Sequence, residues 1–105
     1  HEAAKQALRL LEDNLAALNN RIRQTHEQLR SIQKEIDEQQ ERLVLASQTG
    51  RLKRIILRLN PERIEHYLQE LEMKYDSYHL RLKQDKHGQA ALEWTGFLQS
   101  MLQMK

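Results

Sequence analysis

The chain has 105 residues, of which 30% are charged and 5% aromatic, and its formal net charge is +2. This composition is too poor in aromatic residues for a thick globular core, but it suits long helices packed along a shared stripe. The absence of cysteine excludes disulfide bonds, thiolate catalysis and cysteine-ligated zinc. No apolar run approaches the ~20 residues of a membrane span, so we expect no such span. The absence of cysteine fits a reducing compartment, so we expect an intracellular protein, cytoplasmic or nuclear. Because the chain begins at His1 rather than Met, we also expect it to be part of a longer protein.

Residues 1–49 carry the most regular pattern in the sequence. Apolar residues recur every seven positions, and a second series follows three residues after each of them. This is the a/d pattern of a coiled coil, and it predicts one long helix over about residues 3–48. Thr25 and Gln39 occupy two of the d positions, where polar side chains can set register or partner choice. The apolar members, expected to form an interaction seam, are Leu8, Leu11, Leu15, Leu18, Ile22, Leu29, Ile32, Ile36 and Leu43.

Residues 50–60 form the next predicted segment, because Gly50 is the first helix breaker and the apolar register changes there. Leu52, Ile55, Ile56 and Leu59 have helical spacing and predict a short amphipathic helix. We expect these four side chains to cover the end of a helical bundle.

Residues 51–63, which we call the basic elbow, contain five basic residues and one acidic residue. Basic and acidic residues nearly balance in the rest of the chain. The possible contacts to a polyanion are Arg51, Lys53, Arg54, Arg58 and Arg63. A solvated or internally paired basic face explains the same charges and is the favoured interpretation. No aromatic residue is interleaved with the bases, and no recognition-helix pattern is present.

Residues 61–87 are predicted to form a return helix. Asn60, Pro61 and Glu62 combine an N-cap residue, a proline at the first helical position and an acid in the first turn. Gly88, which follows Lys86 and His87, is expected to end this helix. The apolar stripe of the return helix, the second side of the predicted seam, is Ile64, Leu68, Leu71, Tyr75, Tyr78 and Leu82.

Residues 88–105 are predicted to form a separate apolar helix. It has apolar residues on more than one face, so we expect it to contact more than one neighbour. Two arrangements are open: the helix folds back on the first half of residues 1–49, or it docks on another subunit. In the second arrangement the possible partner anchors are Trp94, Phe97, Leu98 and Met101.

The predicted architecture is therefore all-α, a single elongated domain, with oligomers expected. One arrangement is a helical hairpin or small elongated bundle, in which a long helix packs against a broken return arm. The other is a parallel dimer through residues 3–48, with the second half of the chain as an appended bundle. Short connections and the two arms of similar length favour the hairpin.

The sequence offers no pattern typical of catalysis. It has no glycine-rich phosphate loop and no nucleophile elbow, and its carboxylates are spread over charged helix faces. His66 has a possible weak metal partner in Glu62 or Glu70, but zinc needs three or four ligands. We expect no enzyme, metal or cofactor. The favoured function is a structural or protein-interaction module that forms a homo-oligomer or joins a coiled-coil complex; the alternative is nucleic-acid or other polyanion binding through the basic elbow.

Overall fold

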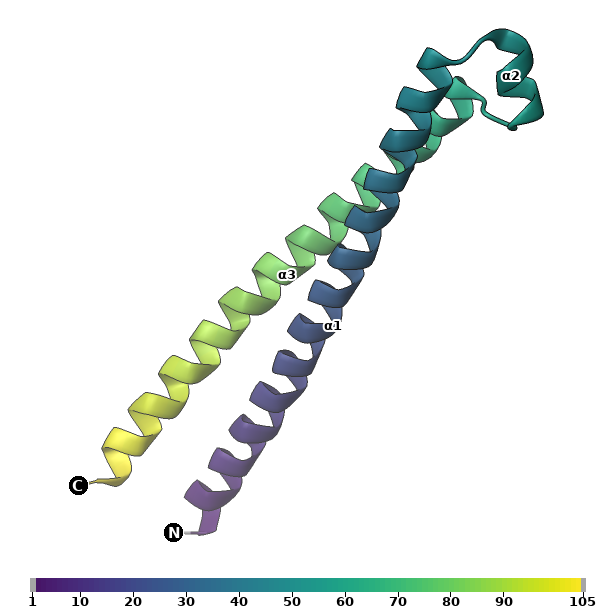
Figure 1. Ribbon diagram of the computed structural model, residues 1–105. Helices are drawn as coiled ribbons and strands as arrows, with labels where there is room; N and C mark the ends of the chain where they lie inside the picture. The colour runs from purple at the N-terminus through teal and green to yellow at the C-terminus, as the bar shows by residue number, and fades with distance from the viewer. Residues whose placement is uncertain (1, 105) are drawn as a thin grey trace. The chain divides into compact units, whose positions relative to one another are not determined.

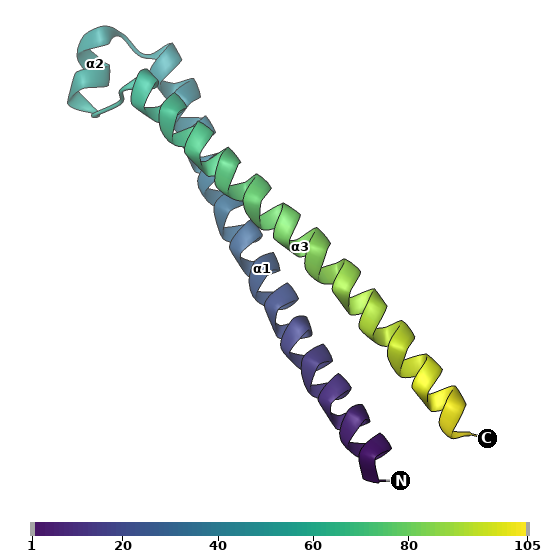
Figure 2. The same cartoon turned by 180° about the vertical axis from the view of Figure 1, so that it is seen from behind.

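The computed structural model describes residues 2–104 and contains two long helices joined by a short one. The elements are α1 (Glu2–Gln48), α2 (Arg51–Ile56) and α3 (Pro61–Gln103). In Figures 1 and 2, two views from opposite sides, α1 and α3 lie side by side and α2 lies in the connection between them. The predicted all-α helical hairpin is confirmed. In this hairpin, α3 packs along the stripe of α1 that would contact a second copy of the chain in the alternative parallel dimer.

Helix α1 follows the prediction closely. It covers the expected residues 3–48 and begins one residue earlier, with the acidic Glu2 in its first turn. It ends two residues before Gly50. Along its whole length the a and d positions are the buried or half-buried ones, and the positions between them are mostly exposed. The heptad pattern therefore places one continuous stripe of α1 against a neighbour.

Helix α3 begins at the predicted capping sequence. The Asn60 side-chain Oδ1 accepts hydrogen bonds from the backbone N–H groups of Glu62 at 3.1 Å and Arg63 at 3.3 Å. These two bonds satisfy backbone donors that have no partner inside the helix. Pro61 has no N–H to satisfy, and Glu62 places a negative charge in the first turn.

The predicted end of this helix at Gly88 is wrong. Helix α3 continues through Gly88 and Gly96 to Gln103, so residues 61–87 and 88–105 do not form separate helices. None of the described glycines has a positive φ, the conformation that a glycine at a helix end usually adopts. Instead, a Cβ added at Gly88 would lie 3.5 Å from Leu18 Cδ2, and one at Gly96 would lie 3.1 Å from Leu11 Cδ2. These glycines lie where α3 faces α1 closely.

The connection after α2 is a Schellman-type ending. The Leu59 N–H donates to the Arg54 carbonyl at 2.7 Å, and the Arg58 N–H donates to the Ile55 carbonyl at 3.2 Å. Arg58 occupies the left-handed position of this motif with φ 56°, where glycine is the usual residue. Leu59 follows with a buried side chain. The turn thus reverses the chain at the expense of mild backbone strain at Arg58.

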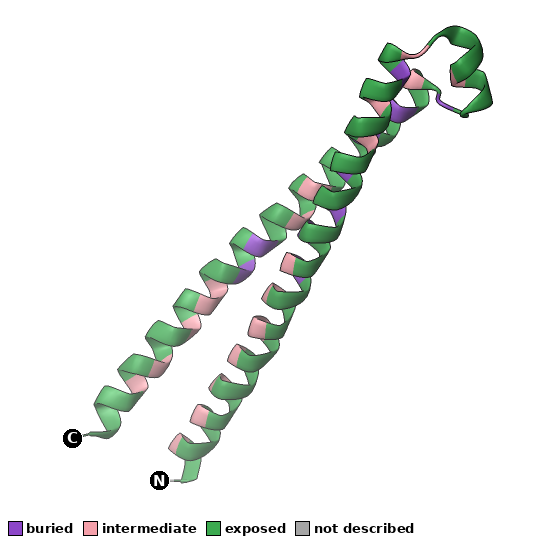
Figure 3. Cartoon of the chain, in the orientation of Figure 1, coloured by how far each residue is buried: buried purple, intermediate pink, exposed green. Residues whose placement is uncertain are grey.

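The contacts divide the chain into two compact units, each containing a part of α1 and a part of α3. The unit of residues 27–79 has an apolar core along the two helices and Leu59, with Leu43, Tyr75 and Tyr78 packed at its margin. In Figure 3 the buried positions lie on the facing sides of the helices, whereas α2 is mostly exposed. The buried members of this core are Ile32, Ile36, Ala46, Leu59, Ile64, Leu68 and Leu71.

The unit of residues 2–26 and 80–104 has a thinner core. Leu82 is its buried large apolar side chain, and the seam residues of α1 in this unit are half-buried rather than buried. Thr25, one of the polar d positions, is buried, and its hydroxyl donates to the Arg21 carbonyl at 2.8 Å. This bond satisfies Thr25 within its own helix, so the residue needs no polar partner on α3.

We predict that Gly88→Ala stabilises the protein. Because Gly88 lies inside a continuous helix with room for a methyl group beside Leu18, alanine should raise the free energy of unfolding by about 0.5–1 kcal/mol. Urea unfolding followed by circular dichroism measures this change. Gly96→Ala is the matched control and should gain less, because its Cβ would crowd Leu11. A loss of stability in Gly88→Ala would instead place Gly88 at a helix end.

We also predict that Arg58→Gly stabilises the turn. Glycine removes the left-handed strain at this position, and the gain should be roughly 0.5–1 kcal/mol after its larger unfolded-state entropy is subtracted. Arg58→Ala removes the same charged side chain but keeps the strain, so thermal unfolding should show no gain for it. Equal melting temperatures for the two variants would contradict the strain.

Candidate interaction surfaces

The predicted seam lies inside the chain. In both units its side chains line the contact between α1 and α3, so they are covered by the chain's own helices. The buried members are Leu29, Ile32, Ile36, Ile64, Leu68, Leu71 and Leu82, and the half-buried members are Leu8, Leu11, Leu15, Leu18, Ile22, Leu43, Tyr75 and Tyr78. Much of the seam surface is therefore occupied by contacts within the chain.

Beyond Leu82, the side of α3 that faces α1 becomes polar. Asp85 is buried, and Gln89 and Gln99 are half-buried, at positions that continue the alternating spacing of the α3 seam. The Gln89 amide donates to Asn19 Oδ1 on α1. Leu92 is the large apolar residue among these positions. The strongest apolar side chains of this segment must consequently point elsewhere.

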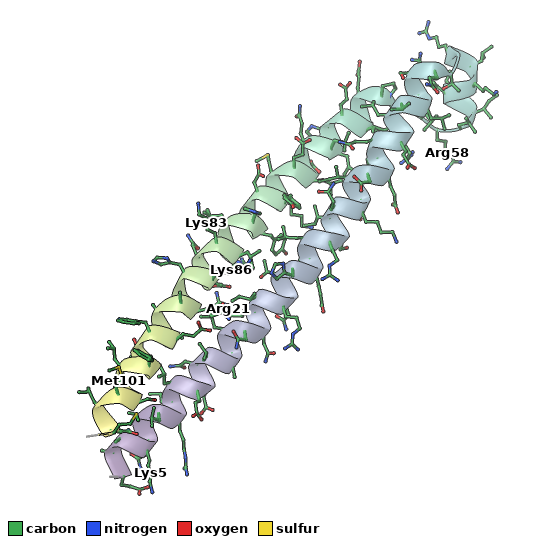
Figure 4. The ribbon with its side chains drawn as sticks, turned by 60° about the vertical axis from the view of Figure 1, so that its left-hand side comes forward. Lys5, Arg21, Arg58, Lys83, Lys86 and Met101 are labelled. Atoms are coloured by element: carbon green, nitrogen blue, oxygen red, sulfur yellow. The ribbon has the colours of Figure 1, made fainter. Side chains whose placement is uncertain are left out.

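Asp85 is the buried charge of this polar stretch. Its Oδ1 accepts a hydrogen bond from Arg21 Nη2 at 2.9 Å, and the two side chains are 8% and 61% exposed, respectively. Figure 4 labels Arg21 on α1. The second oxygen, Oδ2, is buried and has no hydrogen-bond partner among the described residues. Because the carboxylate is buried and has a single, exposed partner, the contact is not strong evidence that Asp85 stabilises the fold.

The C-terminal apolar face, which we define as Trp94, Phe97, Leu98, Met101 and Leu102, points away from α1. These residues follow helical spacing on the side of α3 opposite its seam positions, and they are 43% to 70% exposed. Trp94 and Phe97 stack on each other with ring centroids 5.6 Å apart. Met101, labelled in Figure 4, marks this segment. The segment after Gly88 packs along the first half of α1, as one of the two predicted arrangements expected, but it does so through positions such as Leu92 and Gly96. The predicted anchors Trp94, Phe97, Leu98 and Met101 are exposed, and their docking on another subunit stays a prediction.

The C-terminal apolar face is also nearly free of charge. Between Gln89 and Met104 the only charged residue is Glu93. Depletion of charge around exposed aromatic side chains is typical of the centre of a protein–protein interface. Large apolar patches of this kind on a monomer usually mark an interaction site.

The basic elbow is a second exposed apolar surface. We expected Leu52, Ile55 and Ile56 to cover the end of a bundle, and that prediction is wrong: their side chains are 69% to 78% exposed. The connection bends so that only Leu59 reaches the core, and α2 is too short to turn a second face inward. Leu57 in the following turn is exposed as well.

The five basic residues of the elbow are placed differently. Arg51, Lys53, Arg58 and Arg63 are exposed. Arg54 is half-buried, and its Nε donates to the Thr49 carbonyl at 3.0 Å, which fixes the end of α1 to α2. Arg54 is therefore a structural residue as well as a cation, whereas the other four are free to meet a partner's charge.

Two open grooves lie beside the elbow. One, of about 450 Å³, is lined by both apolar and basic side chains: Arg51, Arg54, Ile55, Arg58, Leu59, Asn60, Pro61 and Arg63. The other, of about 420 Å³, is lined by Gln39, Arg42, Arg58, Asn60, Arg63, Ile64 and Tyr67. Arg58 and Arg63 border both grooves, so anionic groups would find cations on either side of the turn.

Two contacts of titratable side chains lie on the exposed sides of the helices. The Tyr67 hydroxyl lies 3.4 Å from Glu35 Oε2, and its loss of hydration against α1 together with that carboxylate raises the pKa of Tyr67 above its usual value. His66 Nε2 lies 3.2 Å from Glu70 Oε1 on an exposed face. Within residues 2–104, no three His, Cys, Asp or Glu side chains come together as metal ligands do.

Among the described residues, no helix has both the length and the apolar character needed to cross a membrane. The chain matches no protein-family model, no curated protein and no solved structure. In the described part of the chain, the C-terminal apolar face and the basic elbow each expose several large apolar side chains.

Sequence reasoning missed the polar seam of Asp85, Gln89 and Gln99. The signal was present, because the three–four spacing of Leu71, Tyr75, Tyr78 and Leu82 continues onto these positions without a break. Following apolar residues alone led instead to the stripe of Trp94 and Leu98. The seam of α3 is therefore defined by its three–four spacing and contains polar as well as apolar residues.

We predict that Asp85→Leu stabilises the hairpin. Leucine would replace a poorly paired buried carboxylate with apolar surface, and exposed Arg21 would stay hydrated, so the free energy of unfolding should rise by about 1 kcal/mol or more. Urea unfolding measures the change. Asp85→Asn, which keeps the shape of the side chain, should not show this gain. A lower stability for Asp85→Leu would mean that the contact with Arg21 is net stabilising.

Proposed function

We propose that the chain is a protein-interaction module, a helical hairpin that self-associates through the C-terminal apolar face. The observation that supports this is the orientation of the last part of α3. Polar residues such as Asp85 and Gln89 face α1, while Trp94 and Phe97 face outward. A helix usually buries its apolar side against its neighbour. A segment whose polar side faces α1 and whose apolar side faces outward is therefore typical of a helix that has a second neighbour.

The size of the face suits a specific interface. Its two aromatic and three aliphatic side chains expose on the order of 500 Å² of apolar surface, compared with about 800 Å² of total surface per partner in a standard interface. Burying half-exposed side chains of this kind contributes roughly 1 kcal/mol each. Summed over two copies, that contribution is of the same order as the ~4–15 kcal/mol that association costs, so this face by itself supports weak self-association.

A second copy of the chain is the favoured partner because the C-terminal apolar face can pack against the same face of another copy without opposing like charges. In a two-fold symmetric dimer the same patch meets itself, so any charge in its centre would be opposed by a like charge. Glu93 is the only charged residue between Gln89 and Met104, which keeps this repulsion small. The stacked rings of Trp94 and Phe97 would form the centre of the interface. A different helical subunit of a larger scaffold is the other possible occupant.

Nucleic-acid binding through the basic elbow is the second candidate. Four exposed cations in residues 51–63 support it. Leu52, Ile55 and Ile56 count against it, because proteins hold nucleic-acid backbones with cations and polar groups rather than with exposed aliphatic side chains. The elbow is better matched to a ligand that has apolar as well as anionic parts.

We predict that Trp94→Ala/Phe97→Ala weakens self-association by about ten-fold or more, because the two stacked rings are the largest side chains of the face. Sedimentation velocity over a range of concentrations measures the dissociation constant. Both side chains are exposed, so the helical circular dichroism of the variant should match that of the parent.

The matched control is Leu52→Ala/Ile56→Ala, which truncates two exposed apolar side chains of the elbow and should leave association unchanged. A folded parent that stays monomeric at every concentration would contradict self-association and assign the face to a different subunit. Association that survives Trp94→Ala/Phe97→Ala would place the interface elsewhere on the chain.

A further inference from the structure

The short helix α2 has an arrangement that the self-association described above does not use. Leu52, Ile55 and Ile56 share one side of it by helical spacing, and all three are largely exposed. Arg51 and Lys53 lie on either flank of that side, and Arg54 lies on the opposite side, where it is bonded to the Thr49 carbonyl. Aliphatic side chains flanked by cations are typical of helices that lie in a lipid–water interface.

We propose that the basic elbow binds the surface of an anionic phospholipid bilayer. In this arrangement Leu52, Ile55 and Ile56 enter the boundary between headgroups and acyl chains. Arg51 and Lys53 stay at the level of the headgroups, where their charges meet lipid phosphates and carboxylates. This proposal is independent of self-association, because it concerns a different surface.

The charge of the elbow is complementary to such a surface. Residues 51–63 carry five basic residues, and their one acid, Glu62, lies in the first turn of α3, after the exposed aliphatic side chains. Each cation close to an anionic leaflet strengthens the binding constant by about five-fold. Arg58 and Arg63 border both grooves of the elbow, and these grooves combine guanidinium groups with Ile55, Leu59 and Ile64, as a phosphate attached to an apolar chain requires.

The elbow is also held in place before it meets a ligand. Arg54 ties it to the end of α1, the Schellman-type bonds close it after α2, and Asn60 caps the start of α3. A preorganised loop loses less conformational entropy on binding than a flexible one. Arg58 places a cation in this turn, in a left-handed backbone conformation that glycine usually adopts.

A bilayer explains the exposed side chains better than nucleic acid or an acidic protein does. Nucleic-acid binding would use the arginines but leave Leu52, Ile55 and Ile56 in water. A protein partner would need apolar pockets complementary to these three projecting side chains, whereas a fluid interface adapts to their shape. Insertion of a few aliphatic side chains needs no more apolar surface than α2 offers, because the cations add the rest of the affinity.

Co-sedimentation with vesicles tests this proposal. The folded chain should bind vesicles of phosphatidylcholine and phosphatidylserine at a ratio of roughly 3:1 and should bind vesicles of phosphatidylcholine alone at least about ten-fold more weakly. Added salt should weaken binding to the anionic vesicles, since the contacts are at the surface. Absence of binding to anionic vesicles at low salt would overturn the proposal.

Two elbow variants separate the contributions of charge and apolar contact. Arg51→Gln/Lys53→Gln/Arg58→Gln and Leu52→Ser/Ile55→Ser/Ile56→Ser should each lower binding by about ten-fold or more. All six residues are exposed, and circular dichroism should show that both variants keep the helical content of the parent.

The matched control, Arg23→Gln/Arg30→Gln/Lys34→Gln, removes three exposed cations from α1 and should change vesicle binding by less than about two-fold, because these charges are not next to apolar anchors. Equal losses for the control and the elbow charge variant would overturn the proposal. Unchanged binding in the serine variant would also overturn it, since charge alone would then hold the chain. Binding of a DNA or RNA oligonucleotide more tightly than anionic vesicles, unaffected by the serine substitutions, would assign the elbow to nucleic acid.

Discussion

The structure depends on one constraint: the stripe along α1 must be covered by α3 from the same chain. A long amphipathic helix is not stable by itself, because its apolar side remains in water and local helix propensity is too weak to compensate. Leu29, Ile32 and Ile36 on α1 are buried together with Ile64, Leu68 and Leu71 on α3. The spacing of three and four residues on both helices is what allows this contact to repeat along their length.

The same constraint determines the chemistry of the C-terminal part of α3. The three–four spacing of the buried and half-buried positions on α3 continues past Leu82, and it identifies which later residues face α1. Asp85, Gln89 and Gln99 fall on that side, and Trp94 and Phe97 fall on the opposite one. The unit of residues 2–26 and 80–104 consequently buries less apolar surface within itself, and a partner on its outer face would stabilise it by mass action.

The two exposed surfaces differ in the kind of partner that they suit. The C-terminal apolar face combines stacked aromatic rings with almost no charge, which favours a protein partner of the same kind. The elbow combines aliphatic side chains with cations, which favours a ligand that is both apolar and anionic. Each surface exists because a segment that would otherwise pack inward is turned outward by the geometry of its helix or turn.

The sequence by itself determined the helical class, the extent of α1 and the start of α3. Heptad spacing and the Asn60-Pro61 cap act through residues that are close together in the chain, so their effect does not depend on tertiary contacts. Two features were decided only by the tertiary structure. Gly88 looked like a helix end, yet it lies inside α3, because the helix continues through it and along α1. Leu52, Ile55 and Ile56 looked like core residues, yet they are exposed, because the direction of a short helix is set by the turns at its two ends. Local patterns specify which residues are apolar and helical, but the side that each apolar group faces depends on how distant segments meet.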